Sequence, residues 1–149
     1  MVWAAFSAIG KSRIALLDGK QSSSHYIYTL SEFLLSFVHL HCGDAFVFQQ
    51  DNASIHVSVE TRSFLAEQDI TVMEWPARSL DLNPIKNVWS LLSAQVYADG
   101  KQFSSVSELK AAIEDAWEAL SVSSLRMLVG TMTKRCIGMI SRQENTTHY

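Results

Sequence analysis

The first half of the chain alternates short apolar blocks with polar or glycine-containing breaks. The block from Met1 to Gly10 predicts a strand buried on both faces, and residues 13–17 should return beside it after a tight turn. Apolar residues at helical spacing then predict a helix over residues 24–42 whose inward face includes His41. The next blocks predict a strand at 46–50, a helix at 54–68 with Val59 inward, and a strand at 71–75.

Helical spacing dominates the second half. Asn83 and Pro84 predict the start of a helix over residues 84–97, because Asn caps unpaired amides and Pro fits the first helical position. The apolar stripe of this helix leaves Lys86 in the first turn, away from the centre of the stripe. Two more helices are predicted, one from a Ser105 and Glu108 capping box to Leu120, and one from Ser121 to about Ser141.

The order of these elements indicates an α/β protein. A strand, a helix and a strand in succession need a crossover connection, so the strands at 46–50 and 71–75 should be parallel, with the helix on one sheet face. We therefore expect one domain, residues 1–149, with a mixed sheet flanked by helices. Its expected parts are a core at 1–98, C-terminal helices at 99–142 and a tail at 143–149.

Composition narrows the cellular setting. With 149 residues and 48% hydrophobic content, the chain can bury one ordinary core. Cys42 and Cys136 lie in apolar helical patterns, which favours buried thiols in a reducing compartment over a disulfide. No apolar run approaches the roughly 20 residues that span a bilayer, and the apolar start lacks the basic residues of a secretory signal. We expect a nuclear or cytoplasmic protein that is neither secreted nor inserted in a membrane.

Charge is unevenly distributed along the chain. The net charge of −3 argues against a free-standing nucleic-acid binder, since Lys and Arg supply most non-specific affinity. Residues 51–100 contain three basic and seven acidic residues, whereas residues 126–142 contain four basic residues and no acid. This last segment is either a DNA-binding surface or a solvated helix face, and its basic residues are Arg126, Lys134, Arg135 and Arg142.

Two segments carry a specific resemblance. Residues 51–56 read Asp-Asn-Ala-Ser-Ile-His, and residues 75–89 run from Trp75 through Asn-Pro-Ile-Lys to Trp89. They resemble the regions around the second and third catalytic acids of mariner-superfamily DNA transposases. Further matches to nematode-type members, at residues 1–7, 101–117 and 147–149, occur in the same order, so the resemblance covers nearly the whole chain.

The resemblance implies an RNase H-like DDE endonuclease domain that cuts and rejoins DNA during transposition and integration. Members use two Mg²⁺ or Mn²⁺ ions held by three carboxylates, because paired cations stabilise both the attacking and the leaving oxygen of a phosphoryl displacement. Here Asp51 matches the second acid, but Lys86 stands at the third position. The first acid belongs to a central strand that would precede Met1, and this chain lacks it.

Lys86 changes the expected chemistry of the site. An ammonium cannot ligate Mg²⁺ and repels it, by about 4 kcal/mol per unit charge of the ion at 4 Å and an effective dielectric near 20. Lys86 either forms a salt bridge with Asp51 in place of the metal or extends into solvent. No other acid replaces the lost ones: Asp81 should bond turn amides, and Glu74 and Asp18 match no family acid.

For two further residues and for the sheet, the sequence leaves alternatives open. His56 either contacts a DNA phosphate or packs at a helix start, and Arg78 either meets phosphate or is solvated. Without its central strand, the sheet should be compromised between the strands at 1–10 and 46–50. Those strands then pair directly, recruit another strand, or leave a marginally stable fold. Alternatively, upstream sequence with the missing strand was clipped from the reading frame.

The sequence thus predicts a truncated, degenerate transposase domain that is inactive alone, with a weak or lost metal site at Asp51 and weak residual nucleic-acid binding. The alternative is a repurposed module in which the old site and the basic last helix bind DNA or a protein. The oligomeric state is left open.

Overall fold

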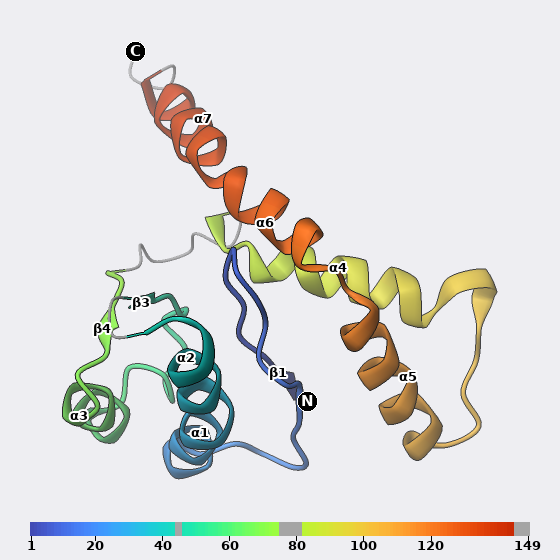
Figure 1. The fold of residues 1–149 in the computed structure, drawn as a ribbon. Coiled ribbons are helices and arrows are strands. Elements are labelled where there is room, and N and C mark those ends of the chain that lie inside the picture. Colours follow the sequence, from blue (N-terminus) through green and yellow to red (C-terminus); the bar gives the residue numbers. More distant parts are fainter. Residues whose placement is uncertain (44–45, 75–81, 145–149) are drawn as a thin grey trace. The chain divides into compact units, whose positions relative to one another are not determined.

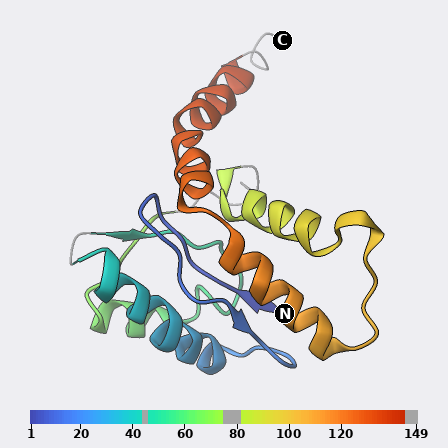
Figure 2. The ribbon, with the colours of Figure 1, turned by 45° about the vertical axis from the view of Figure 1, so that its right-hand side comes forward.

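The computed structural model describes residues 1–43, 46–74 and 82–144. The chain divides into two compact parts, Met1–Arg78 and Ser79–Tyr149, and each is described by itself (Figure 1 and Figure 2). The first contains all four described strands, and the second is helical. The sequence-based boundaries at 98 and 142 stay a prediction.

The first part begins with the predicted hairpin. Strand β1 (Val2–Trp3) pairs antiparallel with β2 (Ala15–Leu16), and an isolated bridge between Phe6 and Lys11 continues the pairing toward the turn. The Ser12 hydroxyl accepts a hydrogen bond of 2.9 Å from the Ala5 amide, which fastens the turn. The predicted return of residues 13–17 is confirmed.

One long helix follows, as predicted. It consists of α1 (Ser23–Thr29), a π-helical turn η1 (Leu30–Leu35) and α2 (Ser36–His41). A reciprocal cap starts it, since the Ser22 hydroxyl accepts from the His25 amide while His25 Nδ1 accepts from the Ser22 amide. His41, expected inward, is exposed because the helix ends there, with its ring 5.4 Å from that of Phe37.

The strand, helix, strand unit is also present. Strands β3 (Val47–Phe48) and β4 (Thr71–Val72) are parallel, as predicted, and α3 (Val59–Glu67) lies between them in the sequence. The predicted helix start at residue 54 is wrong. Ser58 caps α3 by accepting from the Thr61 amide, so Val59 falls in the first turn and is 81% exposed rather than buried.

The expected mixed sheet appears as two separate ladders. Within the described residues, β1 pairs with β2 and β3 pairs with β4, and no ladder joins the two sheets. The core is formed largely by helices, with α1 in contact with α3 (Figure 1). Its buried residues are Tyr26, Leu30, Leu34, Phe37, Val38, Phe48, Leu65 and Ile70.

The second part is built from helices around a buried tryptophan. Its elements are α4 (Ile85–Val96), η3 (Ala98–Gly100), α5 (Val106–Ala119), α6 (Val122–Gly130) and α7 (Met132–Glu144). The Asn83 side chain accepts from the Ile85 amide at 3.2 Å, as its predicted capping role requires. Trp117 is fully buried, with its rings 5.9 Å from those of Trp89. The other buried apolar residues here are Val88, Leu92, Val96, Ala116 and Leu125.

Two local predictions in this part are wrong. The last helix is two helices that meet at Thr131, whose hydroxyl donates to the Leu128 carbonyl at 2.7 Å. The N-cap of α5 is Ser105, as predicted, and only the reciprocal bond of the expected capping box differs. Ser105 accepts from the Glu108 amide as expected, but the Glu108 carboxylate accepts from Ser104, and these bonds lower the pKa of Glu108.

The cysteines differ from each other. Cys42 is half-buried, and burial raises the pKa of its thiol, whereas Cys136 is exposed, so the prediction that both are buried is wrong. The Arg135 guanidinium donates to a residue of α4, and successive residues of a helix point about 100° apart. Cys136 therefore lies on a different side of α7 from Arg135.

In the described part of the chain, no helix combines the length and hydropathy that a membrane span requires.

Candidate functional site

Asp51 lies just beyond β3, in a loop closed by its own side chain. Its Oδ1 accepts a hydrogen bond of 3.2 Å from the Ala53 amide, which is the bond of an Asx turn. The same oxygen lies 2.7 Å from Nδ1 of His56. The Asp51 side chain is 39% exposed. The carboxylate therefore has protein partners before any ligand is considered.

His56 is held from two sides. Its ring stacks on Tyr26, with ring centroids 4.2 Å apart, and its side chain is 18% exposed. Its backbone carbonyl accepts from the Gln50 side-chain amide at 3.2 Å. The structure thus gives His56 the packing role that the sequence left open, while a phosphate contact stays a prediction.

Tyr26 and Gln50 complete the network. The Tyr26 hydroxyl donates to Gln50 Oε1 at 2.7 Å, so α1 is tied to the loop that carries Asp51. Burial raises the pKa of Tyr26 far above its ordinary value, a hydrogen bond with Trp3 opposes the rise, and the charge of Asp51 adds to it. The hydroxyl therefore remains a donor. Sequence reasoning missed both residues, because 24 positions separate them and no spacing rule connects them.

Lys86 occupies the first turn of α4, as predicted, and is exposed. That turn contains no acidic residue. The next residue, Asn87, accepts a hydrogen bond of 2.7 Å from Nη1 of Arg135 on α7. Asp51 and Lys86 belong to different parts of the chain, so the salt bridge between them stays a prediction.

The predicted nucleic-acid contacts fall into three groups. Arg126 on α6 and Lys134 on α7 are exposed. Arg135 is half-buried and also donates from Nε to the Thr131 hydroxyl at 3.0 Å, so it links α7 to α4. Arg78 lies outside the described residues, as does Asp81.

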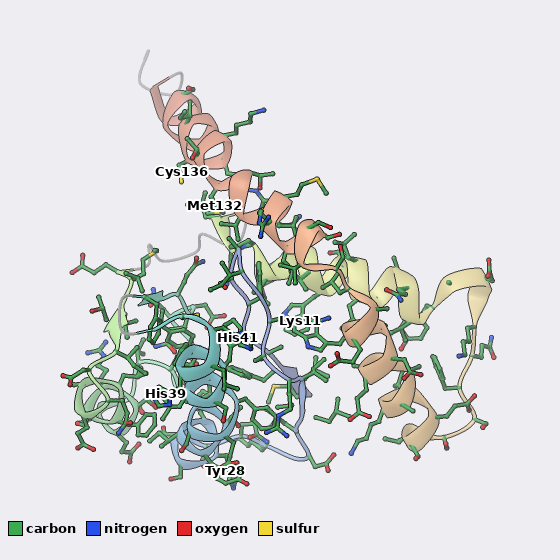
Figure 3. The ribbon with its side chains drawn as sticks, viewed as in Figure 1. Lys11, Tyr28, His39, His41, Met132 and Cys136 are labelled. Atoms are coloured by element: carbon green, nitrogen blue, oxygen red, sulfur yellow. The ribbon has the colours of Figure 1, made fainter. Side chains whose placement is uncertain are left out.

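The described side chains do not gather into a two-metal centre. Among the described residues, no three His, Cys, Asp or Glu side chains gather where they could hold an ion. Asp18 and Glu74 are exposed, as are His39 and His41 on α2 (Figure 3). Two divalent ions need several carboxylate groups, and Asp51 supplies only one.

Comparison with known proteins establishes the family. The family described as DDE superfamily endonuclease matches residues 1–110. Over its whole length, the chain is 40% identical to the transposable element Tc3 transposase of Caenorhabditis elegans, of which it covers 45%. It is 29% identical to the Tc1 transposase of the same nematode, of which it covers 54%. The chain therefore belongs to the DDE superfamily of endonucleases, and it spans about half the length of these curated relatives.

The solved structures agree on the fold. The catalytic domain of Mos1 mariner transposase matches 90% of this chain with a TM-score of 0.78 and 18% sequence identity, and the match covers 69% of that domain. The RNase H-like α/β fold and the resemblance to mariner transposases are thus confirmed. Structures of the Mos1 catalytic domain with raltegravir contain Mn in one case and Mg in another.

Proposed function

We propose that this chain is a degenerate remnant of a cut-and-paste transposase and does not cleave or join DNA by itself. One observation carries the proposal: an exposed lysine, Lys86, stands in the first turn of α4, at the position that the motif resemblance matches to the third catalytic acid. Within these 149 residues, the other family acid position is Asp51.

Electrostatics makes the lysine decisive. Two divalent cations stabilise a phosphoryl transfer only when carboxylates hold them in place. An ammonium offers no lone pair and repels a cation, by about 4 kcal/mol per unit charge at 4 Å and an effective dielectric near 20. Asp51 is further committed to His56 at 2.7 Å. Together these features support loss of stable Mg²⁺ or Mn²⁺ binding.

The remaining activity in this proposal is weak binding of DNA, in the nucleus or cytoplasm. The Tc3 and Tc1 relatives are transposases of transposable elements, and a Mos1 structure is a paired-end complex with Mn. In the second part of this chain, Lys86, Arg126 and Lys134 are exposed cations. Phosphate contacts by such side chains give affinity without base recognition.

A plasmid-nicking assay tests the loss of chemistry. The purified chain, Asp51→Asn and Lys86→Glu are each incubated with supercoiled DNA and Mg²⁺ or Mn²⁺. We expect no nicking by any of them above the background of a chelator control. Magnesium-dependent nicking by the unaltered chain that disappears in Asp51→Asn would overturn the proposal.

A second candidate is a protein-interaction module. It is favoured by two large apolar side chains on the last helices, Met127 at 70% and Ile137 at 58% exposure. Filter binding to DNA over a salt series separates the candidates. Negligible retention even at low salt would remove the DNA-binding function and leave this one.

A further inference from the structure

Acidic and basic residues are segregated among the helices of the second part. The sequence has no Asp or Glu from Leu82 to Ala98, which includes α4, or from Ala119 to Gln143, which includes α6 and most of α7. Helix α5, between these stretches, carries the acids Glu108, Glu114, Asp115 and Glu118. The acid-free stretches contain the bases Lys86, Arg126, Lys134, Arg135 and Arg142.

One hydrogen bond joins the two helix turns that carry three of these cations. Arg135 donates from Nη1 to Asn87 Oδ1 at 2.7 Å, which holds the first turn of α7 against the first turn of α4. Lys86 precedes Asn87, and Lys134 precedes Arg135, so an exposed lysine adjoins each end of this bond. In Figure 3, the labelled side chains of Met132 and Cys136 show where α7, which carries Lys134 and Arg135, begins.

Such a cluster is suited to a polyanion. Cations placed together without an intervening carboxylate repel one another, and a row of phosphates relieves this repulsion. Binding also releases the counterions that were condensed on the phosphates. An ammonium donates directly to a phosphate oxygen, whereas an acid at the same position would need a metal ion between them. Replacement of an acid by Lys86 therefore exchanges an ion ligand for a direct phosphate ligand.

We infer that Lys86, Lys134 and Arg135 form a metal-independent binding site for the phosphates of duplex DNA on the first turns of α4 and α7. This inference rests on the DNA binding proposed above. Lys86 and Lys134 contact phosphate, and Arg135 is a positioning residue that also adds charge. The site requires no contribution from Asp51.

Fluorescence anisotropy with a short labelled duplex tests the site. The full chain is titrated in EDTA over a series of salt concentrations and compared with Lys86→Gln and Lys134→Gln. Each substitution should weaken binding several-fold at low salt and reduce the salt-dependence slope by roughly 0.9, and the double variant should reduce it by roughly 1.8. Lys86→Arg, which keeps the charge, should restore the slope.

The matched control is Lys101→Gln. Lys101 is also exposed, but it lies close enough to the acidic Glu108 to lower the pKa of that carboxyl, so it should contribute little to phosphate binding. Circular dichroism checks that each variant is folded. Absence of binding by the unaltered chain at the lowest salt would overturn the DNA-binding function itself. Binding that requires Mg²⁺, or that falls equally in Lys86→Gln and Lys101→Gln, would overturn this site alone.

Discussion

Asp51 and Lys86, the two positions that the motif resemblance singles out, have different surroundings in this chain. Asp51 lies in a loop where its carboxylate bonds the Ala53 amide and His56, and where His56 in turn stacks on Tyr26. Lys86 lies on an exposed helix turn that contains no acid. The Asp51 carboxylate thus has contacts within the protein, whereas Lys86 is open to solvent.

The difference shows how each position tolerates change. A side chain with several partners is constrained by the fold, because its removal leaves those partners unsatisfied. An exposed first-turn residue is constrained mainly by function, because its substitution changes stability little. The carboxylate of Asp51 thus has a structural role, whereas a substitution at position 86 should change folding stability little.

The largest effect on stability should come from Trp117, whose ring packs against Trp89 of α4. Trp117→Ala should lower the free energy of unfolding by about 3–5 kcal/mol, because it leaves a large cavity beneath the helix that carries Lys86. Trp117 is 0% exposed. Urea denaturation followed by circular dichroism measures the loss. Met127→Ala, at a residue 70% exposed, should stay within about 0.5 kcal/mol, and equal losses in the two variants would contradict the assigned packing.

The network around Asp51 should be sensitive to a single hydroxyl. Tyr26→Phe removes the donor to Gln50 Oε1 and should cost about 1–3 kcal/mol, since the acceptor is left without a partner. Thermal unfolding measures the change. Tyr28→Phe is the matched control, because Tyr28 lies on the same helix but is 66% exposed (Figure 3). If Tyr26→Phe were as stable as this control, the hydroxyl would have no structural role.

Restoring an acid at position 86 should stabilise the helix slightly. Lys86→Glu should raise the free energy of unfolding by about 0.3–1 kcal/mol, because a negative charge in the first turn interacts favourably with the helix dipole. Gln95→Glu, in the last turn of the same helix, should have the opposite sign. Chemical denaturation at low salt provides the comparison. The same sign for both variants would refute the electrostatic explanation.

The smallest effect should be the coupling between Asp51 and His56. Because the Asp51 side chain is 39% exposed, solvent screens the pair, and a double-mutant cycle with Asp51→Asn and His56→Ala should give about 0.2–1 kcal/mol. Thermal unfolding of the four proteins supplies the cycle. Strictly additive single effects would show that the 2.7 Å contact contributes nothing to stability.

The sequence predicted elements that depend on local signals. The parallel unit of β3 and β4, the bond from the Ile85 amide to Asn83 at the start of α4, and the exposure of Lys86 follow from the crossover connection, capping and helical spacing, and all three are observed. Helix limits failed where two local signals competed. Ser54 and Ser58 are both capable N-caps. The later start is favoured by the bond from the Thr61 amide to the Ser58 hydroxyl and by the bond of 2.7 Å from the Thr61 hydroxyl to the Ile55 carbonyl.

The candidate site was predictable to a smaller extent. Motif resemblance located Asp51 and Lys86, but it could not identify the stacking of Tyr26 on His56, because that contact joins segments brought together by the core. Nor could sequence spacing connect Arg135 to Asn87, which lie 48 positions apart. Contacts between side chains far apart in the sequence depend on the angles at which helices pack. A single sequence contains no local signal for those angles.

The division of the strands into two short ladders has a consequence for hydrogen exchange. Each ladder contains two strands of two residues, so its amide protons are protected by few cooperative bonds. The helix from Ser23 to His41, with its fully buried Leu30, is stabilised by extensive packing. Solvent deuterium should therefore enter the ladders through local opening long before it enters the middle of that helix, which makes the sheets the least persistent structure of the first part.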